Sequence, residues 1–273
     1  MEKHQTIIEP PASFAPGFAE LWKFRELLYF FTWRDIKVKY KQTSLGILWA
    51  LLQPISLMLL FTFIFSRNLK VDIGSQSYEV FVFSGLLLWN LFYGGVANAS
   101  ESILSHASMI RKIYFPRILI PASSLVVAFF DFMIAFVVFL VFCFIKGESP
   151  GLDAILSIPA AVGMVMISAF GLGSFFSALN VRYRDFRYVV PFMLQFMFFA
   201  SQVVYPLRSI GQDWLRYLLS LNPVNGAIEI FRWGFTGEAD SLVIYTGLII
   251  SIILAIAGFI YFKKAESRFA DLA

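Results

Sequence analysis

The chain has 273 residues, of which 59% are apolar and 15% charged, against about half and about a quarter in soluble domains. Its 32 phenylalanines and single cysteine exclude intrinsic disorder and a disulfide scaffold. The net charge of +4 would indicate nucleic-acid binding only if the positive residues shared one surface. The apolar residues form unbroken runs, which indicates a chain whose solvent is lipid.

A helix needs roughly 17 to 25 mostly apolar residues to cross a bilayer. Segments of this kind lie at about Leu45–Phe65, Val80–Ala99, Ile118–Ile145, Ala154–Leu179, Tyr188–Tyr205 and Leu242–Phe262. We therefore predict an all-α integral membrane protein with six transmembrane helices. Asp131 lies deep in the third segment, where an acid is either functional or a paired structural group.

The positive residues between the segments set the orientation, because cytoplasmic flanks retain Lys and Arg. Sixteen of the 22 fall on the side that carries both termini, and six fall on the other. This predicts a multi-pass protein of the cytoplasmic membrane with both termini in the cytoplasm. The imbalance also accounts for the net charge without nucleic acid. The predicted regions are a cytoplasmic N-terminus with an interface helix (1–43), the six-span domain (44–262) and a cytoplasmic tail (263–273).

Residues 21–42 are predicted to form an amphipathic helix along the inner membrane surface. Its apolar residues recur at helical spacing and are Leu21, Phe24, Leu28 and Phe31. The interface-helix residues Arg34, Lys37 and Lys41 lie on another face. The alternative interpretation is a basic anchor that serves orientation alone.

The connection at residues 100–117 is predicted to contain a short cytoplasmic helix that ends before Pro116. It carries Ile103, Ala107, Ile110 and Tyr114 on one side, with Ser102, Ser105, His106 and Met109 facing elsewhere. A small, mostly uncharged knob of this kind suits docking into a groove of another protein, and a plain linker is the alternative. His106 is expected to be a polar surface residue and not a metal ligand.

In the fourth segment, Ala169, Gly173 and Ser177 recur every four residues. Small residues at this spacing let helices approach closely. The pattern predicts tight packing, either within one subunit or across a dimer.

The fifth segment carries rings and amides on one helical face. The residues follow a 4-3-4-3 spacing and are Tyr188, Phe192, Gln195, Phe199 and Gln202. A lipid-facing stripe would explain the rings, but amides avoid lipid. We therefore predict that this face lines a pore or the bundle interior, where rings could stack on sugars and amides could bond hydroxyls.

The loop at residues 206–241 is long yet apolar, which is unusual for a segment in water. Asn222 and Pro223 fit an N-cap and a first helical position, and Gly234 fits a stop. With a second short helix at 213–221, this predicts a helical hairpin on the outer side, before the last span, that dips into the membrane.

The residues needed for common catalytic chemistry are missing. The sequence has no P-loop motif and no Gly-Lys dipeptide, so the chain is not expected to bind nucleotide phosphates in this way. Two histidines and one cysteine leave no common zinc site and few possible triads. The chain is therefore not expected to be an enzyme or to hold a metal or other cofactor.

Four stretches, in chain order, carry a family resemblance. They are Arg34–Thr43 with Leu45–Ala50 and Gln53-Pro54, then Arg111–Arg117 with Pro121, then Tyr183–Asp185, and finally Leu221–Pro223 with Arg232. Together they resemble the membrane subunits of type-2 ABC exporters that move polysaccharide, of the Wzm type. The family usually has Ser-Pro-Val/Ile-Tyr at the exit of the fifth span, where this chain has Ser201–Pro206.

The resemblance implies a homodimer that works with two copies of a cytoplasmic ATPase, which would hold ATP and Mg. It implies a coupling helix at about Ser102–Arg111, and the candidate ATPase-coupling residues are Ser102, Ser105, His106, Met109 and Arg111. The implied substrate is a glycan on an undecaprenyl diphosphate carrier, threaded between subunits. The candidate substrate-path residues are Phe192, Gln195, Phe199 and Gln202, with Trp49 and Tyr205 as neighbours.

The expected glycan is the O-antigen of lipopolysaccharide. The alternatives are export of teichoic acid or capsular polysaccharide, a type-2 exporter of a small drug or lipid, and a membrane scaffold that transports nothing.

Overall fold

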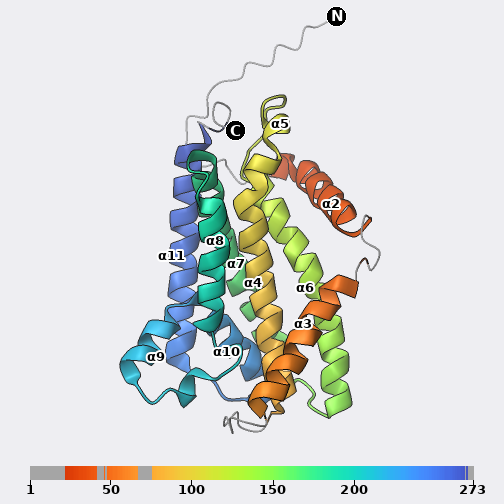
Figure 1. Cartoon of the computed structure of the whole chain (residues 1–273), viewed down its shortest axis with the longest axis vertical. Coiled ribbons are helices and arrows are strands. Elements are labelled where there is room, and N and C mark those ends of the chain that lie inside the picture. Colours follow the sequence, from red (N-terminus) through yellow and green to blue (C-terminus); the bar gives the residue numbers. More distant parts are fainter. Residues whose placement is uncertain (1–21, 42–45, 47, 67–75, 268, 270–273) are drawn as a thin grey trace, which may run out of the picture.

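The computed structural model describes residues 22–41, 46, 48–66, 76–267 and 269, and the regular elements in these ranges are helical. They are α2 (Arg25–Lys41), α3 (Leu48–Phe61) with the π-helix η1 (Thr62–Ser66), α4 (Tyr78–Ser105), α5 (Ala107–Ile110), α6 (Leu119–Lys146), α7 (Ala154–Arg182), α8 (Phe186–Phe199), η2 (Leu207–Ser209), α9 (Asp213–Ser220), α10 (Pro223–Thr236) and α11 (Ser241–Glu266). The short α5 lies at one end of the bundle, near α2, and α9 and α10 lie at the other (Figure 1).

Four of these helices, α4, α6, α7 and α11, are long and apolar enough to cross a membrane. The predicted spans at these positions are confirmed as helices, and α4 continues past its predicted end at Ala99 to Ser105. The apolar stretch Leu51–Phe65 and α8 are shorter. With 14 residues, α8 is about 21 Å long, less than the hydrocarbon thickness.

The predicted fifth span, Tyr188–Tyr205, is wrong at its end, because the helix stops at Phe199. Asn225 of α10 hydrogen-bonds the backbone just after the end of α8. Its Nδ2 donates to the carbonyl of Ala200 (3.1 Å), and its Oδ1 accepts from the backbone nitrogen of Gln202 (2.7 Å). These bonds satisfy backbone groups that a longer helix would have paired internally.

The central helix is α4, which packs against α6 and α7; in Figure 1, α3 crosses in front of it and α8 stands beside it. The small residues of α7 face it. A Cβ on Gly173 would lie 2.7 Å from the Cβ of Ala99, and one on Gly95 would lie 3.2 Å from that of Ala169. Ala169, Gly173 and Ser177 are all buried within the chain. The small-residue stripe therefore packs helices within one subunit.

A second close approach joins α7 to α11. A Cβ on Gly258 would overlap the carbonyl oxygen of Gly171, so the two backbones touch at this crossing. No local pattern in the sequence predicts this pair. The two glycines lie 87 residues apart, and neither belongs to a four-residue repeat of small residues.

The predicted helical hairpin before the last long helix forms as α9 and α10. The Asn222 side chain accepts from the backbone nitrogen of Val224 (3.2 Å) and Pro223 begins α10, which confirms the predicted start. The helix ends at Gly237, with φ of 71°, and not at Gly234. Gly234 instead lets α10 approach α7, since a Cβ there would lie 2.8 Å from the Cα of Ala154.

We expect Gly258→Ala to destabilise the subunit by about 2 kcal/mol, because the added methyl must push two helix backbones apart. The thermal midpoint of the purified protein, followed by tryptophan fluorescence, should fall by several degrees. Gly163→Ala is the matched control, because Gly163 lies inside α7 with open space around it. Equal midpoints for the two variants would contradict the close crossing.

Candidate functional site

The interface helix α2 is anchored by one buried ring. Phe31 is fully buried and packs against the rings of Phe115 (centroids 5.5 Å apart) and His106 (5.6 Å). Tyr29, Phe30 and Trp33 are exposed. The predicted separation into an apolar and a charged face is therefore too simple, because apolar side chains lie both toward the bundle and away from it. Leu21 falls outside the described residues.

The three predicted interface-helix cations have different surroundings. Arg34 donates to Asp35 (2.7 Å) and contacts His106, so it faces the protein. Lys37 is exposed, and its ammonium lies 5.1 Å from the centroid of the Trp33 ring. Lys41 is exposed. Only Lys37 and Lys41 therefore match a solvated or lipid-headgroup-facing surface.

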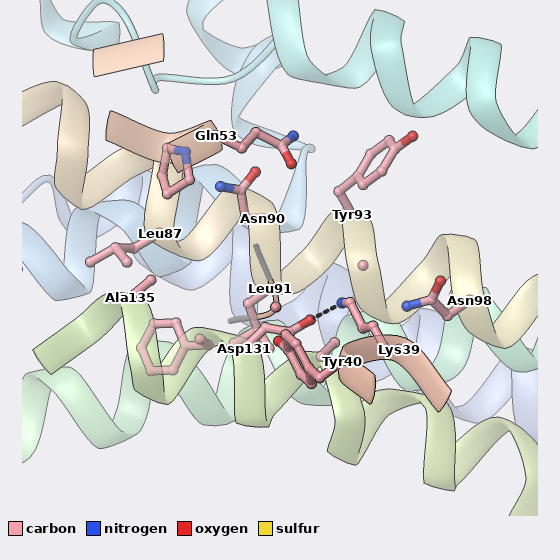
Figure 2. A pocket seen from close by; sticks show the side chains of 15 residues that line it. Lys39, Tyr40, Gln53, Leu87, Asn90, Leu91, Tyr93, Asn98, Asp131 and Ala135 are labelled. Carbon is pink, nitrogen blue, oxygen red and sulfur yellow. Dashed lines mark hydrogen bonds and ion pairs between the residues drawn. The ribbon is translucent and has the colours of Figure 1, made fainter. Parts of the chain in front are cut away.

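The far end of α2 is tied to Asp131 of α6. Lys39 forms an ion pair with one carboxylate oxygen, and the Tyr40 hydroxyl donates to the other (Figure 2). Burial raises the pKa of Tyr40, and its hydrogen bond to Asp131 acts in the same direction. Asp131 lies about 18 Å along α6 from Leu119. It is therefore a paired acid that connects α2 to the interior of the bundle.

His106 joins α4 to α5 and is buried, so the prediction of a surface histidine is wrong. Its Nδ1 lies 2.7 Å from the carbonyl of Ser102, and its Nε2 contacts the guanidinium of Arg34. Arginine can only donate, so Nε2 accepts and Nδ1 carries the proton. Burial is the main cause that lowers the pKa of His106, and the charge of Arg34 lowers it further. The imidazole is therefore neutral.

The predicted coupling helix takes the form of a protruding tip. The helix α4 runs to Ser105, and α5 adds a single turn. Of the candidate coupling residues, Ser105 and Arg111 are exposed and Met109 is half-buried, but Ser102 and His106 are buried. Ser102 donates to the carbonyl of Ala99 (2.6 Å). Ser102 and His106 therefore hold the tip in place and do not form its surface.

Two residues beside this tip are exposed, which the sequence pattern did not predict. Ile113 and Tyr114 are 59% and 61% exposed. Tyr114 was expected on the same side as the buried Ile103 and Ile110, because the helical period was extended through it. The helix ends at Ile110 and a turn follows at Arg111 and Lys112. Residues 113–116 have no regular structure, and Pro116 disfavours helix in the residue before it.

The helix α8 presents an exposed face of rings. Phe192 and Phe199 are 73% and 66% exposed, and Gln195 between them is exposed as well. Phe196, which the 4-3-4-3 spacing passed over, is 69% exposed on the same helix. The structure therefore places three of the candidate path residues together and adds Phe196 as a third ring.

The other candidate path residues lie elsewhere. Gln202 is buried, and its Nε2 donates to the carbonyl of Asn225 (2.6 Å), so its assignment to the α8 face is wrong. Tyr205 is half-buried, and its hydroxyl donates to the carbonyl of Phe199 (2.8 Å). Trp49 lies in α3, but its side chain is outside the described residues. The chain reverses after Phe199, which removes Gln202 from the helical register.

Residues 26–236 match the ABC-2 type transporter family. An O-antigen export system permease protein RfbA of Klebsiella pneumoniae is 32% identical over 90% of this chain and 95% of its own length. An RfbA of Myxococcus xanthus is 28% identical over 92% and 97%. The polysialic acid transport protein KpsM of Escherichia coli is 23% identical over 86% and 92%.

We expect Asp131→Leu or Lys39→Leu alone to lower the free energy of unfolding by about 1 kcal/mol, since each removes one partner of the ion pair. The double Leu variant should recover most of this loss. Lys37→Leu is the control, because Lys37 is an exposed lysine of the same helix. Thermal midpoints of the purified proteins measure the effect. Additive losses in the double variant would show that the two residues do not interact.

Proposed function

Because the chain belongs to the ABC-2 type transporter family, we propose that it is the membrane subunit of an ATP-driven exporter that moves a polysaccharide across the cytoplasmic membrane. The observation that carries this proposal is the match of about nine-tenths of the chain to O-antigen export permeases. O-antigen is the favoured cargo. Capsular polysaccharide is the second candidate, because KpsM and the capsule export protein CtrC of Neisseria meningitidis match at 22–23% identity.

In the proposed topology, α3 with η1 and α8 join the four long helices to give six spans. Both termini and the α5 tip face the cytoplasm, where the sequence concentrates its Lys and Arg. Thinning of the bilayer or protein cover at the outer side accommodates the shorter spans. The α10 helix supports this arrangement, because its residues are buried against α7 and α11, as backbone at membrane depth requires.

A separate ATPase docks on the coupling tip and holds ATP and Mg. The accessible side chains for this contact are Ser105, Met109, Arg111, Ile113 and Tyr114. The contacts of α2 provide a route from the tip to the bundle. His106 beside the tip contacts Arg34 at the middle of α2, and Lys39 and Tyr40 near its end hold Asp131 of α6. A displacement of the tip would therefore also displace α6.

The passage for the lipid-linked glycan lies between two copies of the subunit. The exposed face of α8, with Phe192, Gln195, Phe196 and Phe199, fits a wall of this passage. Ring stacking contributes about 1 kcal/mol for each contact, which guides a sugar chain without holding it. A face of rings alone would suit lipid equally well, and Gln195 is the residue that favours the passage.

We expect the wild-type gene to restore cell-surface polysaccharide to a strain from which this gene has been deleted. The double variant Phe192→Ala with Phe199→Ala should restore several-fold less polysaccharide, because stacking on the sugar rings is lost. Immunoblots of surface polysaccharide measure export. The matched control is Phe144→Ala, because Phe144 is an exposed ring on α6. Equal export by the α8 double variant and by Phe144→Ala would show that the α8 face contacts lipid and does not line the passage.

We expect Tyr114→Asp to reduce copurification of the ATPase subunit about tenfold, because it places a charge in the contact surface. Tyr217→Asp alters an exposed tyrosine of α9, at the opposite end of the bundle, and should leave copurification unchanged. Full ATPase recovery with Tyr114→Asp would exclude Tyr114 from the contact.

A further inference from the structure

A cavity of about 370 Å³ opens between α2, α3, α4 and α6. Asn90, Tyr93 and Asn98 line it from α4, and Gln53 lines it from α3. In Figure 2, Gln53, Asn90 and Tyr93 lie above Asp131 and its partners Lys39 and Tyr40, and Asn98 lies at the right. Asn90, Gly94 and Asn98 recur every four residues and so share one face of α4. The described residues that line the cavity include none from α8.

The four neutral polar side chains of this cavity have no hydrogen-bond partner among the described residues. Amides that are buried elsewhere in the described chain have partners. Asn180 donates to the carbonyl of Ser100 (2.8 Å), and Asn225 bonds Gln202, Ala200 and Leu219. An amide at membrane depth needs a partner, because lipid tails offer none. The partners of Asn90 and Asn98 must therefore come from outside the chain.

The charges of the cavity select against an ionic ligand. Lys39 and Asp131 are paired with each other, so the lining carries no net charge at this point. A diphosphate group would find no unpaired cation among the described lining residues, and a metal ion would find no unpaired carboxylate. Amides and a phenol bond neutral hydroxyls well, because they supply donors and acceptors together.

The remaining lining suits a sugar ring. Pro54, Leu87 and Phe132 supply apolar surface beside the polar groups. A sugar presents the same combination, with apolar faces and hydroxyls around the rim. The volume lies at the small end of the range for small-molecule sites, which is room for a short stretch of glycan. At 1.5 Å per residue, Asn98 is about 10 Å and Leu87 about 27 Å from the α5 end of α4, so the cavity spans the middle of this helix.

We propose that this cavity is a glycan-binding subsite, in which Gln53, Asn90, Tyr93 and Asn98 bond the hydroxyls of a neutral sugar segment within the membrane. The inference rests on the proposed function and goes beyond the α8 face. A contact of α2 closes one side of the subsite through Lys39 and Tyr40. Binding there is therefore coupled to the position of α2.

The direct test is protection from labelling in the complete exporter, reconstituted in lipid nanodiscs. Asn90→Cys and Asn98→Cys should react with a water-soluble maleimide, because the cavity is hydrated. Delipidated polysaccharide fragments from the strain that carries the gene should slow the reaction at least fivefold. Ile253→Cys is the control on the exposed apolar face of α11 and should not react, while the native Cys143 is buried.

Two results of this test overturn the subsite. The first is no maleimide labelling at either position. This result is expected if lipid or a second copy of the chain fills the cavity. The second is a reaction rate that the polysaccharide fragments leave unchanged, which would make the cavity a water-filled space without affinity for glycan.

Export by variants separates this inference from the proposed function. Asn90→Leu with Asn98→Leu should reduce surface polysaccharide about tenfold, whereas the Ser pair, which keeps hydrogen bonding, should retain most of it. ATPase copurification reports on folding. Normal export by the Leu pair in a strain where the wild-type gene restores polysaccharide overturns the subsite alone. Failure of the wild-type gene to restore polysaccharide overturns the proposed function and the subsite with it.

Discussion

Polar groups within a bilayer have no water to bond, and this constraint explains the most specific contacts of the chain. Where the backbone leaves α8, Asn225 supplies the missing partners. Where Arg232 of α10 is buried, it donates to the carbonyl of Phe81 (2.9 Å) and lies over the Phe81 ring. Asn225 and the partners of Arg232 thus let an irregular or charged group remain buried. The same constraint makes the unpaired amides of the α4 cavity notable.

The second constraint is the close approach of helices, which lipid does not drive. An apolar side chain gains about as little from burial against a neighbouring helix as from contact with a lipid tail. The contact area between helices therefore depends on small residues that let the backbones approach. Gly173 against Ala99 and Gly171 against Gly258 bring α4, α7 and α11 together at backbone distance. This rigid group leaves α2, α3 and α8 at its margin, where the exposed rings and the polar cavity lie.

The position of α2 connects these parts. One helix touches the buried histidine beside the protruding tip and the acid inside α6. An interface helix that only oriented the chain would need neither contact. The pairing of Asp131 also removes its charge from the cavity lining, which leaves neutral groups to define what that space can bind.

The sequence by itself determined the membrane class, the helices α4, α6, α7 and α11, the start of α10 and the family, because apolar length, capping residues and motifs are local properties of the chain. Only the tertiary structure decided that His106 is buried, that Gln202 leaves the α8 face and that Asp131 is paired. Each of these outcomes depends on residues distant in the chain: Arg34 is 72 positions from His106, and Lys39 is 92 from Asp131. A helical period describes one element, whereas the partner of a buried polar group is set by which elements the fold brings beside it.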